Sequence, residues 1–174
     1  MATTLETKRL LLVPMTRECL SAVDDAAAIA RVTRAHVPDS WPVEHYDQDV
    51  LDFTRKALDA DPETEFVIRY MVLREPLRTV IGMFGVSEPT DDGRLVIGYS
   101  VLPEHRRQGF ASEALAAVVA WGFRDPRVMV ISGDTYPELT ASIKTMESCG
   151  FTFAGAGEGD GVIRYELPRV ARAF

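Results

Sequence analysis

The sequence of 174 residues contains only two cysteines, Cys19 and Cys149, which lie far apart and have neither Cys-x-x-Cys nor zinc-site spacing. This scarcity excludes a disulfide-stapled secreted domain and indicates free thiols in a reducing compartment. No group of His, Cys and carboxylate residues has metal-ligand spacing, so we expect no metal. No apolar run approaches the roughly 18 residues of a membrane span, and residues 1–8 lack the apolar segment of an export signal. We therefore expect a cytoplasmic protein with no membrane partner.

Positive charge is also scarce, because 19 Lys and Arg residues against 26 Asp and Glu residues give a formal net charge of −7. This balance argues against a nucleic-acid partner and is compatible with a cationic amine as substrate. The phosphate-binding patterns Gly-x-x-x-x-Gly-Lys-Ser/Thr and Gly-x-Gly-x-x-Gly are both absent around Gly109. Repeats, low-complexity tracts and linkers are absent too. We expect one domain over residues 1–174, and the oligomeric state, a homodimer included, stays open.

What the sequence does contain is a strand, a basic loop and a helix in direct succession. Residues 96–102 are rich in β-branched and aromatic residues and stop at Pro103, and residues 111–122 carry an apolar stripe at helical spacing. The loop between them contains Arg106 and Arg107, followed by Gln108 and Gly109. Free N–H groups at a helix start suit phosphate oxygens, and glycine lets the backbone approach a ligand closely. The pattern favours a pyrophosphate cradle, and the alternative is an ordinary loop with solvated arginines.

The rest of the chain alternates between segments with the apolar pattern of a strand and segments with the apolar pattern of a helix. Strands are expected at 8–15, 66–73, 79–86, 95–102, 128–132, 151–153 and 162–167, and helices at 17 onward, 26–37, 43–60, 111–122 and 138–149. Turn residues 88–93 predict a hairpin between the third and fourth strands. Three consecutive strands without helices indicate an α+β layout with a mixed sheet.

Arg106-x-x-Gly109-x-Ala111 after a strand resembles the acetyl-CoA motif of the GNAT N-acetyltransferases, Arg/Gln-x-x-Gly-x-Gly/Ala, and the element order resembles their fold. The opening residues 6–14 also resemble the branch of ribosomal-protein N-terminal acetyltransferases (RimJ/RimL type). The resemblance implies a GNAT fold in which strands four and five splay apart and receive acetyl-CoA, with the Val101 N–H polarising the thioester carbonyl. It implies that the cofactor-binding residues are Tyr99, Ser100, Val101, Arg106, Arg107, Gln108, Gly109, Phe110, Ala111, Ser112, Ser142 and Met146.

The resemblance extends to residues 136–151, where relatives read Asn-x-x-Ser followed by a tyrosine position and Gly-Phe. Ser142 matches the serine, but Leu139 replaces the asparagine and Met146 replaces the tyrosine that protonates the leaving thiolate. The acid role then falls to Ser142, to a water or to no specific group. A serine in a helix can instead bond its own backbone; the motif favours contact with the CoA sulfur.

The general base is harder to place, because many relatives read Glu-Ile-Gly-Tyr where this chain has Val96-Ile-Gly-Tyr99. A carboxylate must take a proton from the substrate ammonium. We expect Glu88, at the end of the third strand, with Asp39 as the second candidate. The alternative is that both are solvated loop carboxylates.

The resemblance implies an enzyme that moves an acetyl group from acetyl-CoA to a primary amine, either a small molecule or a protein N-terminus. No nucleophilic Ser-His-Asp or Cys-His set is visible, which agrees with direct attack in a ternary complex. The second hypothesis is a CoA-binding regulatory or interaction domain with impaired catalysis, because Val96, Leu139 and Met146 replace residues that many relatives use.

Overall fold

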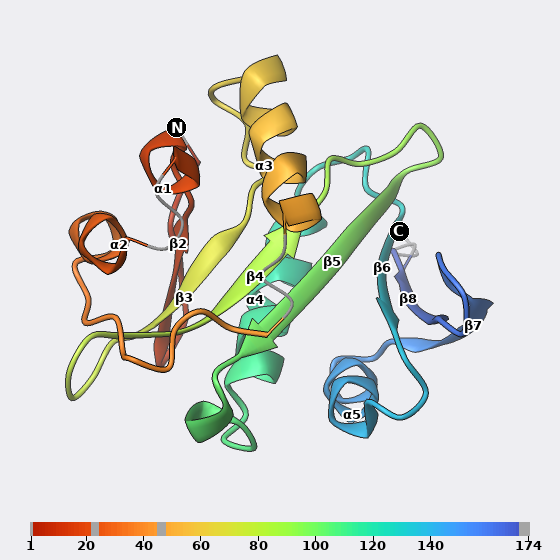
Figure 1. Cartoon of the computed structure of the whole chain (residues 1–174). Helices are drawn as coiled ribbons and strands as arrows, with labels where there is room; N and C mark the ends of the chain where they lie inside the picture. Colours follow the sequence, from red (N-terminus) through yellow and green to blue (C-terminus); the bar gives the residue numbers. More distant parts are fainter. Residues whose placement is uncertain (1, 22–24, 45–47, 171–174) are drawn as a thin grey trace.

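The computed structural model describes residues 2–21, 25–44 and 48–170, and Figure 1 shows a twisted sheet with helices on both sides. In chain order the elements are β1 (Leu5–Glu6), β2 (Leu10–Pro14), α1 (Arg17–Ser21), α2 (Ala26–Thr33), α3 (Gln48–Ala60), β3 (Arg69–Leu73), β4 (Thr79–Val86), β5 (Arg94–Val101), the 3-10 turn η1 (Pro103–His105), α4 (Phe110–Gly122), β6 (Val130–Thr135), α5 (Thr140–Ser148), β7 (Thr152–Ala156) and β8 (Ile163–Pro168). Among these residues, no helix is long and apolar enough to cross a bilayer.

The described strands form one sheet in the order β1-β2-β3-β4-β5-β6-β8-β7. Every neighbouring pair is antiparallel except β5 and β6, which are parallel. A parallel pair needs a crossover connection, and α4 supplies it. The mixed α+β sheet flanked by helices that the sequence predicts is therefore confirmed.

Each face of the sheet has its own apolar core, because successive side chains of a strand point to opposite faces. In β2, Leu10 and Leu12 pack with α4 on one face, while Leu11 packs with α1, α2 and α3 on the other. We call these the α4 face and the α3 face. The α4 face also receives Met146 of α5.

Helix α4 forms because its apolar residues recur at helical spacing and all turn to one side. Phe110, Ala114, Leu115, Val118 and Gly122 are the buried positions of this helix. No side chain caps its first turn, and the N-cap residue is Gly109 with φ 78° and ψ 11°. This left-handed conformation is inexpensive for glycine and costly for residues with a Cβ atom.

Several elements differ in their bounds from the sequence expectation. Helix α2 ends at Thr33 rather than at residue 37, and β6 runs from Val130 to Thr135 rather than over 128–132. The strand expected over 66–73 begins at Arg69, because the Ile68 carbonyl accepts from the Met15 N–H (2.8 Å) and its N–H donates to Thr54 Oγ1 (3.3 Å) rather than to a neighbouring strand. The helix expected over 43–60 is described as α3 from Gln48 onward, and residues 45–47 of that expectation lie outside the described residues. The two-residue strand β1 has no sequence signal.

Candidate active site

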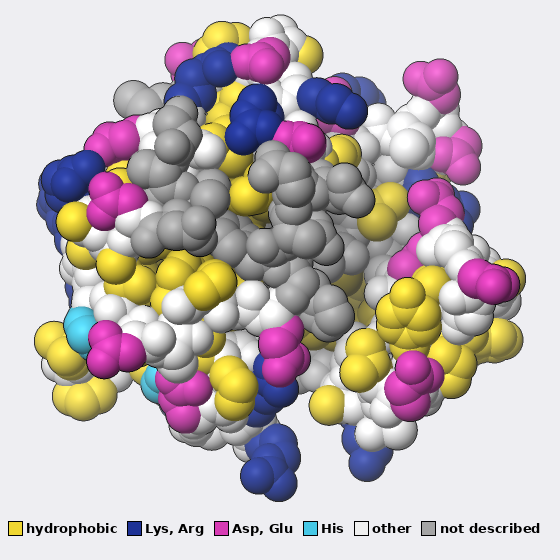
Figure 2. Space-filling model, in the orientation of Figure 1, with side chains coloured by type: hydrophobic (Ala, Val, Ile, Leu, Met, Phe, Trp, Pro, Cys, Tyr) yellow, Lys and Arg dark blue, Asp and Glu magenta, His cyan; other side chains and the backbone are white. Residues whose placement is uncertain are grey.

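Strands β5 and β6 separate halfway along their length. Their register runs from Arg94 opposite Val130 to Ile97 opposite Gly133 and ends there, although β5 continues to Val101 and β6 to Thr135. Figure 1 shows the two strands diverging toward the end that carries α5 and η1. Figure 2 shows a notch at that edge of the molecule, with Lys and Arg side chains on both sides of its mouth. The splay that the sequence predicts is present, and we call it the β5–β6 gap.

Main-chain groups of β5 face this gap at every second residue, because N–H and C=O groups alternate sides along an antiparallel strand. The Ser87 N–H donates to the Val96 carbonyl (2.9 Å) and the Leu102 N–H donates to the Ile81 carbonyl (2.8 Å). The N–H and C=O groups of the even-numbered residues in this stretch, including those of Ser100, therefore point to β4. The N–H groups of Tyr99 and Val101 point into the gap, where the described part of β6 offers them no ladder partner.

The start of α4 provides a second set of free donors. The first hydrogen bond of the helix runs from the Glu113 N–H to the Gly109 carbonyl (3.1 Å). Within the described ranges, the N–H groups of Gly109, Phe110, Ala111 and Ser112 have no acceptor. Such groups carry partial positive charge and bind phosphate oxygens well. The loop before them is exposed, so the helix entrance is not plugged by protein.

The three polar side chains of the loop have separate surroundings. Arg106 donates from Nε to the Val101 carbonyl (2.8 Å) and from Nη2 to Glu44 Oε2 (2.8 Å), so it joins the end of β5 to the α2–α3 link. Arg107 has φ 59° and is exposed, and its guanidinium has no partner in the described part of the chain. Gln108 donates from Nε2 to the Glu104 carbonyl (3.1 Å). Of the two arginines, Arg107 alone is free to meet a phosphate without breaking a bond.

Sequence reasoning missed a half-buried clamp that fixes the start of α4. Glu113 accepts from the Thr7 hydroxyl (2.6 Å), the Arg9 N–H (2.7 Å) and Arg9 Nε (2.6 Å). Arg9 also donates to the Gln108 carbonyl (2.9 Å) and lies 4.4 Å from the centroid of the Phe110 ring. The available signal was an acidic residue in the first turn of a helix that has no side-chain cap.

This clamp predicts a pH-dependent stability. Burial disfavours the charged form of Glu113, but the bonds from Thr7 and Arg9 outweigh it and hold its pKa below the ordinary 4.5. A depressed folded-state pKa contributes stability that is present above the ordinary value and is lost as pH falls through the folded value. We expect Glu113→Gln to lower the free energy of unfolding by about 1–2 kcal/mol at pH 7, and the difference to vanish in acid.

Urea unfolding at pH 7 and in acid measures this difference. The matched control is Glu138→Gln, which removes the same charge from an exposed side chain with no partner among the described residues. A difference for Glu113→Gln that persists unchanged in acid would contradict the role of its carboxylate.

On the α4 face, the side chain of Tyr99 reaches from β5 to α5. Its hydroxyl lies 3.2 Å from the Ser142 carbonyl, to which it donates, and 3.3 Å from Ser142 Oγ. The ring stacks on Phe84 with centroids 5.5 Å apart. Burial raises the pKa of the Tyr99 phenol, and hydrogen bonding to Ser142 and Thr145 offsets this only in part. The Ser142 hydroxyl has no bond to its own helix backbone in the described residues, so it faces Tyr99 instead.

Met146 lies where the gap closes. It is 1% exposed, and a Cβ atom on Gly133 would come within 2.8 Å of its sulfur. Met146 therefore fills the vertex beneath the last paired residues of β5 and β6. Its thioether has no proton to donate, so another group must protonate the leaving thiolate, the role expected of a tyrosine at this position.

Glu88 lies far from the gap, and this position argues against its expected role as general base. It follows β4 directly, and Ser87 pairs with Val96, about 16 Å along the strand from Val101 at the usual rise per residue. Glu88 is exposed and shares a surface hollow with Trp121 and Arg127 at the far end of α4. A general base must lie within hydrogen-bond reach or one water of its proton. Asp39, the second candidate, is also an exposed carboxylate, and among the described residues it has no hydrogen bond or ion pair with a residue of the gap.

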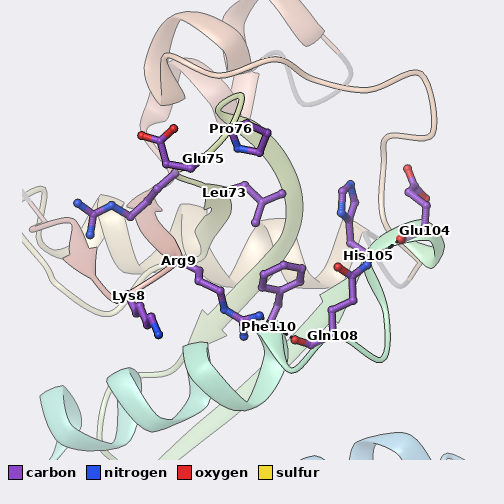
Figure 3. Close-up of a pocket in the computed structure, with 10 residues that line it drawn as sticks. Lys8, Arg9, Leu73, Glu75, Pro76, Glu104, His105, Gln108 and Phe110 are labelled. Atoms are coloured by element: carbon purple, nitrogen blue, oxygen red, sulfur yellow. Dashed lines mark hydrogen bonds between the residues drawn. The ribbon is translucent and has the colours of Figure 1, made fainter.

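A separate cavity of about 580 Å³ lies on the other side of the α4 entrance. Figure 3 shows Arg9 and Phe110 as one wall of it, with Gln108 and His105 beside them and Leu73 opposite. None of its lining residues comes from residues 98–101 or from α5, so it is distinct from the β5–β6 gap. No group of three or more His, Cys, Asp or Glu side chains among the described residues could hold a metal ion.

Comparisons with known proteins agree with this geometry. The model of the acetyltransferase (GNAT) domain matches residues 9–152. The uncharacterized N-acetyltransferase YoaA of Bacillus subtilis is 33% identical over 89 residues, and the match spans 51% of this chain and 50% of the relative. The chain thus matches about half the length of this curated relative.

Two solved structures share the fold at low identity. The ribosomal-protein-S5-alanine acetyltransferase of Vibrio fischeri has a TM-score of 0.68 at 15% identity, covering 95% of this chain and 96% of that one. The spermidine N-acetyltransferase of Vibrio cholerae, in complex with CoA and spermine, has a TM-score of 0.60 at 18% identity, covering 93% and 96%. Because the family model matches most of the sequence, the chain belongs to the GNAT acetyltransferase family.

Proposed function

We propose that this protein transfers the acetyl group of acetyl-CoA to an amine by direct attack in a ternary complex. The observation that carries the proposal is the unpaired half of β5 beside the free N–H groups that open α4. The two sets of N–H donors fit two parts of acetyl-CoA. The diphosphate would lie on the N–H groups of residues 109–112, and the pantetheine arm would lie along β5 in the β5–β6 gap.

Within this arrangement the Val101 N–H is the group that polarises the thioester carbonyl. It is a main-chain donor held in place by the β4–β5 ladder, so it needs no reorganisation as charge develops on oxygen. The Val101 carbonyl is fixed in turn by Arg106 Nε. Proximity and carbonyl polarisation supply much of the rate acceleration in such a displacement.

The acceptor amine would approach from the α3 face. The cofactor reaches the gap from α4 and α5, so the opposite face remains for the nitrogen. Gly98 is exposed on β5, and a Cβ atom there would meet no described atom within 4 Å. Glu44 brings a carboxylate to the end of β5 through Arg106, and the net charge of −7 favours encounter with a cation. A polyamine, another small amine and a protein N-terminus all fit this description.

We infer a cytoplasmic location for the enzyme, and the two free thiols, Cys19 and Cys149, support this inference. The proposed activity needs no metal, because the chain's own main-chain donors supply the electrophilic assistance.

Calorimetry with acetyl-CoA, followed by a thiol-release assay over a panel of amines, tests the function. The panel contains polyamines, aminoglycosides, amino acids and peptides with free or acetylated N-termini, the last as the matched control. We expect binding and amine-dependent release of CoA. Binding without turnover on any amine would favour a CoA-binding regulatory domain, and the absence of binding would overturn both readings.

A further inference from the structure

The ionisable side chain of Tyr99 reaches across the β5–β6 gap, and no sequence motif points to its hydroxyl. Tyr99 starts on β5, in the segment whose main chain faces the gap, and ends at Ser142 on α5. The start of α4 lies beside α5, because Ser112 Oγ is 3.3 Å from Ser148 Oγ and the Cys149 thiol donates to the Ser112 carbonyl (3.5 Å). A ligand that runs from the α4 entrance into the gap therefore passes the Tyr99 hydroxyl.

Tyr99 also lies close to the expected position of the reacting atoms. Residues 99 and 101 of a strand share a face and are about 6.6 Å apart along it. The sulfur of a thioester is bonded to the carbonyl carbon that the Val101 N–H would polarise. The O···O distance of 3.3 Å between Tyr99 and Ser142 is long for a hydroxyl pair, so exchanging it for a ligand contact costs little.

We propose that Tyr99 is a catalytic residue that protonates the departing CoA thiolate, and that Ser142 is a positioning residue that orients its hydroxyl. The inference rests on the proposed acetyl transfer and replaces Ser142 as the expected acid. When the nitrogen displaces the thiol, the C–S bond breaks and its electron pair stays on sulfur. The phenol proton moves to that sulfur. The phenolate then recovers a proton from the nitrogen that becomes the amide, directly or through water, so no further reactant is needed.

The chemistry of the two hydroxyls favours this division of roles. A phenol with a pKa near 10 is a far stronger acid than an aliphatic alcohol. Burial raises the pKa of Tyr99, which keeps it protonated and ready to donate at neutral pH. Ser142 offers two acceptors, its hydroxyl and its carbonyl, and both lie within 3.3 Å of the phenol oxygen.

Tyr99→Phe tests the role while preserving the ring that stacks on Phe84. We expect kcat to fall about 100-fold, the usual scale for a lost general acid, with little change in the KM for acetyl-CoA. We also expect wild-type kcat to fall at high pH as Tyr99 ionises, and this fall to be absent from Tyr99→Phe. A readout without turnover is the ultraviolet absorbance of the thiolate of bound CoA. Loss of a hydrogen bond to the thiolate should raise the pKa of that thiol by about one unit.

Ser142→Ala is the matched variant, because it removes one partner of the phenol and leaves the Ser142 carbonyl in place. We expect kcat to fall less than about tenfold and the high-pH limb to remain. The proposal would be overturned if Tyr99→Phe kept wild-type kcat and left the thiol pKa unchanged. It would also be overturned if Ser142→Ala lowered kcat as much as Tyr99→Phe does. If no amine is turned over, the proposed function fails, while the thiol pKa of bound CoA still decides the role of Tyr99.

Discussion

Replacing Gly109 with valine is expected to weaken acetyl-CoA binding by about 100-fold, or roughly 2.7 kcal/mol. Gly109 has φ 78°, a conformation that a β-branched residue adopts only with strain. Its N–H is the first of the four free donors at the start of α4. Valine would either distort this donor set or place two methyl groups beside the diphosphate. Calorimetry with acetyl-CoA measures the change.

The matched control is Gly161→Val in the turn between β7 and β8. Gly161 has φ 73°, and a Cβ atom there would meet no described atom within 4 Å. It therefore carries the same backbone penalty as Gly109→Val without touching the α4 entrance. If the two variants bound acetyl-CoA with equal affinity, the loop before α4 would not be the diphosphate site.

A truncated ligand separates phosphate binding from the rest of the interaction. S-acetylpantetheine lacks the diphosphate and should bind wild type and Gly109→Val with similar, weak affinity. If valine weakened both ligands equally, its effect would come from a displaced β5–β6 gap rather than from lost phosphate contacts.

The sequence predicts β4 and β5 closely because turn residues bound their apolar runs, whereas β6 occupies 130–135 and not the expected 128–132. Strand β4 occupies residues 79–86 as expected, and β5 begins one residue earlier than expected, at Arg94. The segment 66–68 has buried apolar residues but does not belong to β3, because its main chain bonds to Met15 and Thr54. Hydropathy reports burial, whereas a strand also needs a hydrogen-bonding neighbour.

The sequence alone could have shown that Glu88 lies far from Val101. The turn at 88–93 predicts a hairpin, and a hairpin places the end of one strand beside the start of the next. Glu88 therefore had to lie beside the first residues of β5, at the opposite end from Val101. The bond between Tyr99 and Ser142 could not be found in this way, because it depends on how far α5 leans over the gap.

Replacing Gly82 with alanine is expected to lower the free energy of unfolding by about 2–3 kcal/mol, the upper range for an overpacked interior. A Cβ atom at Gly82 would lie 2.5 Å from the Ser100 carbonyl oxygen and 3.2 Å from the Val101 Cα. Both are main-chain atoms of β5, so relief requires β5 to move rather than a side chain to rotate. Thermal unfolding should show a melting temperature lower by about 5–10 °C.

The same displacement should weaken acetyl-CoA binding, because the segment pushed aside carries the N–H groups that face the gap. Gly98→Ala is the matched control in the neighbouring strand. A Cβ atom there meets nothing within 4 Å, so its stability should stay within about 0.5 kcal/mol of wild type. If Gly82→Ala lost stability but kept wild-type affinity for acetyl-CoA, the main chain of β5 would not bind the cofactor. If it lost both while Gly98→Ala lost neither, the same contact between β4 and β5 would support the fold and the site together.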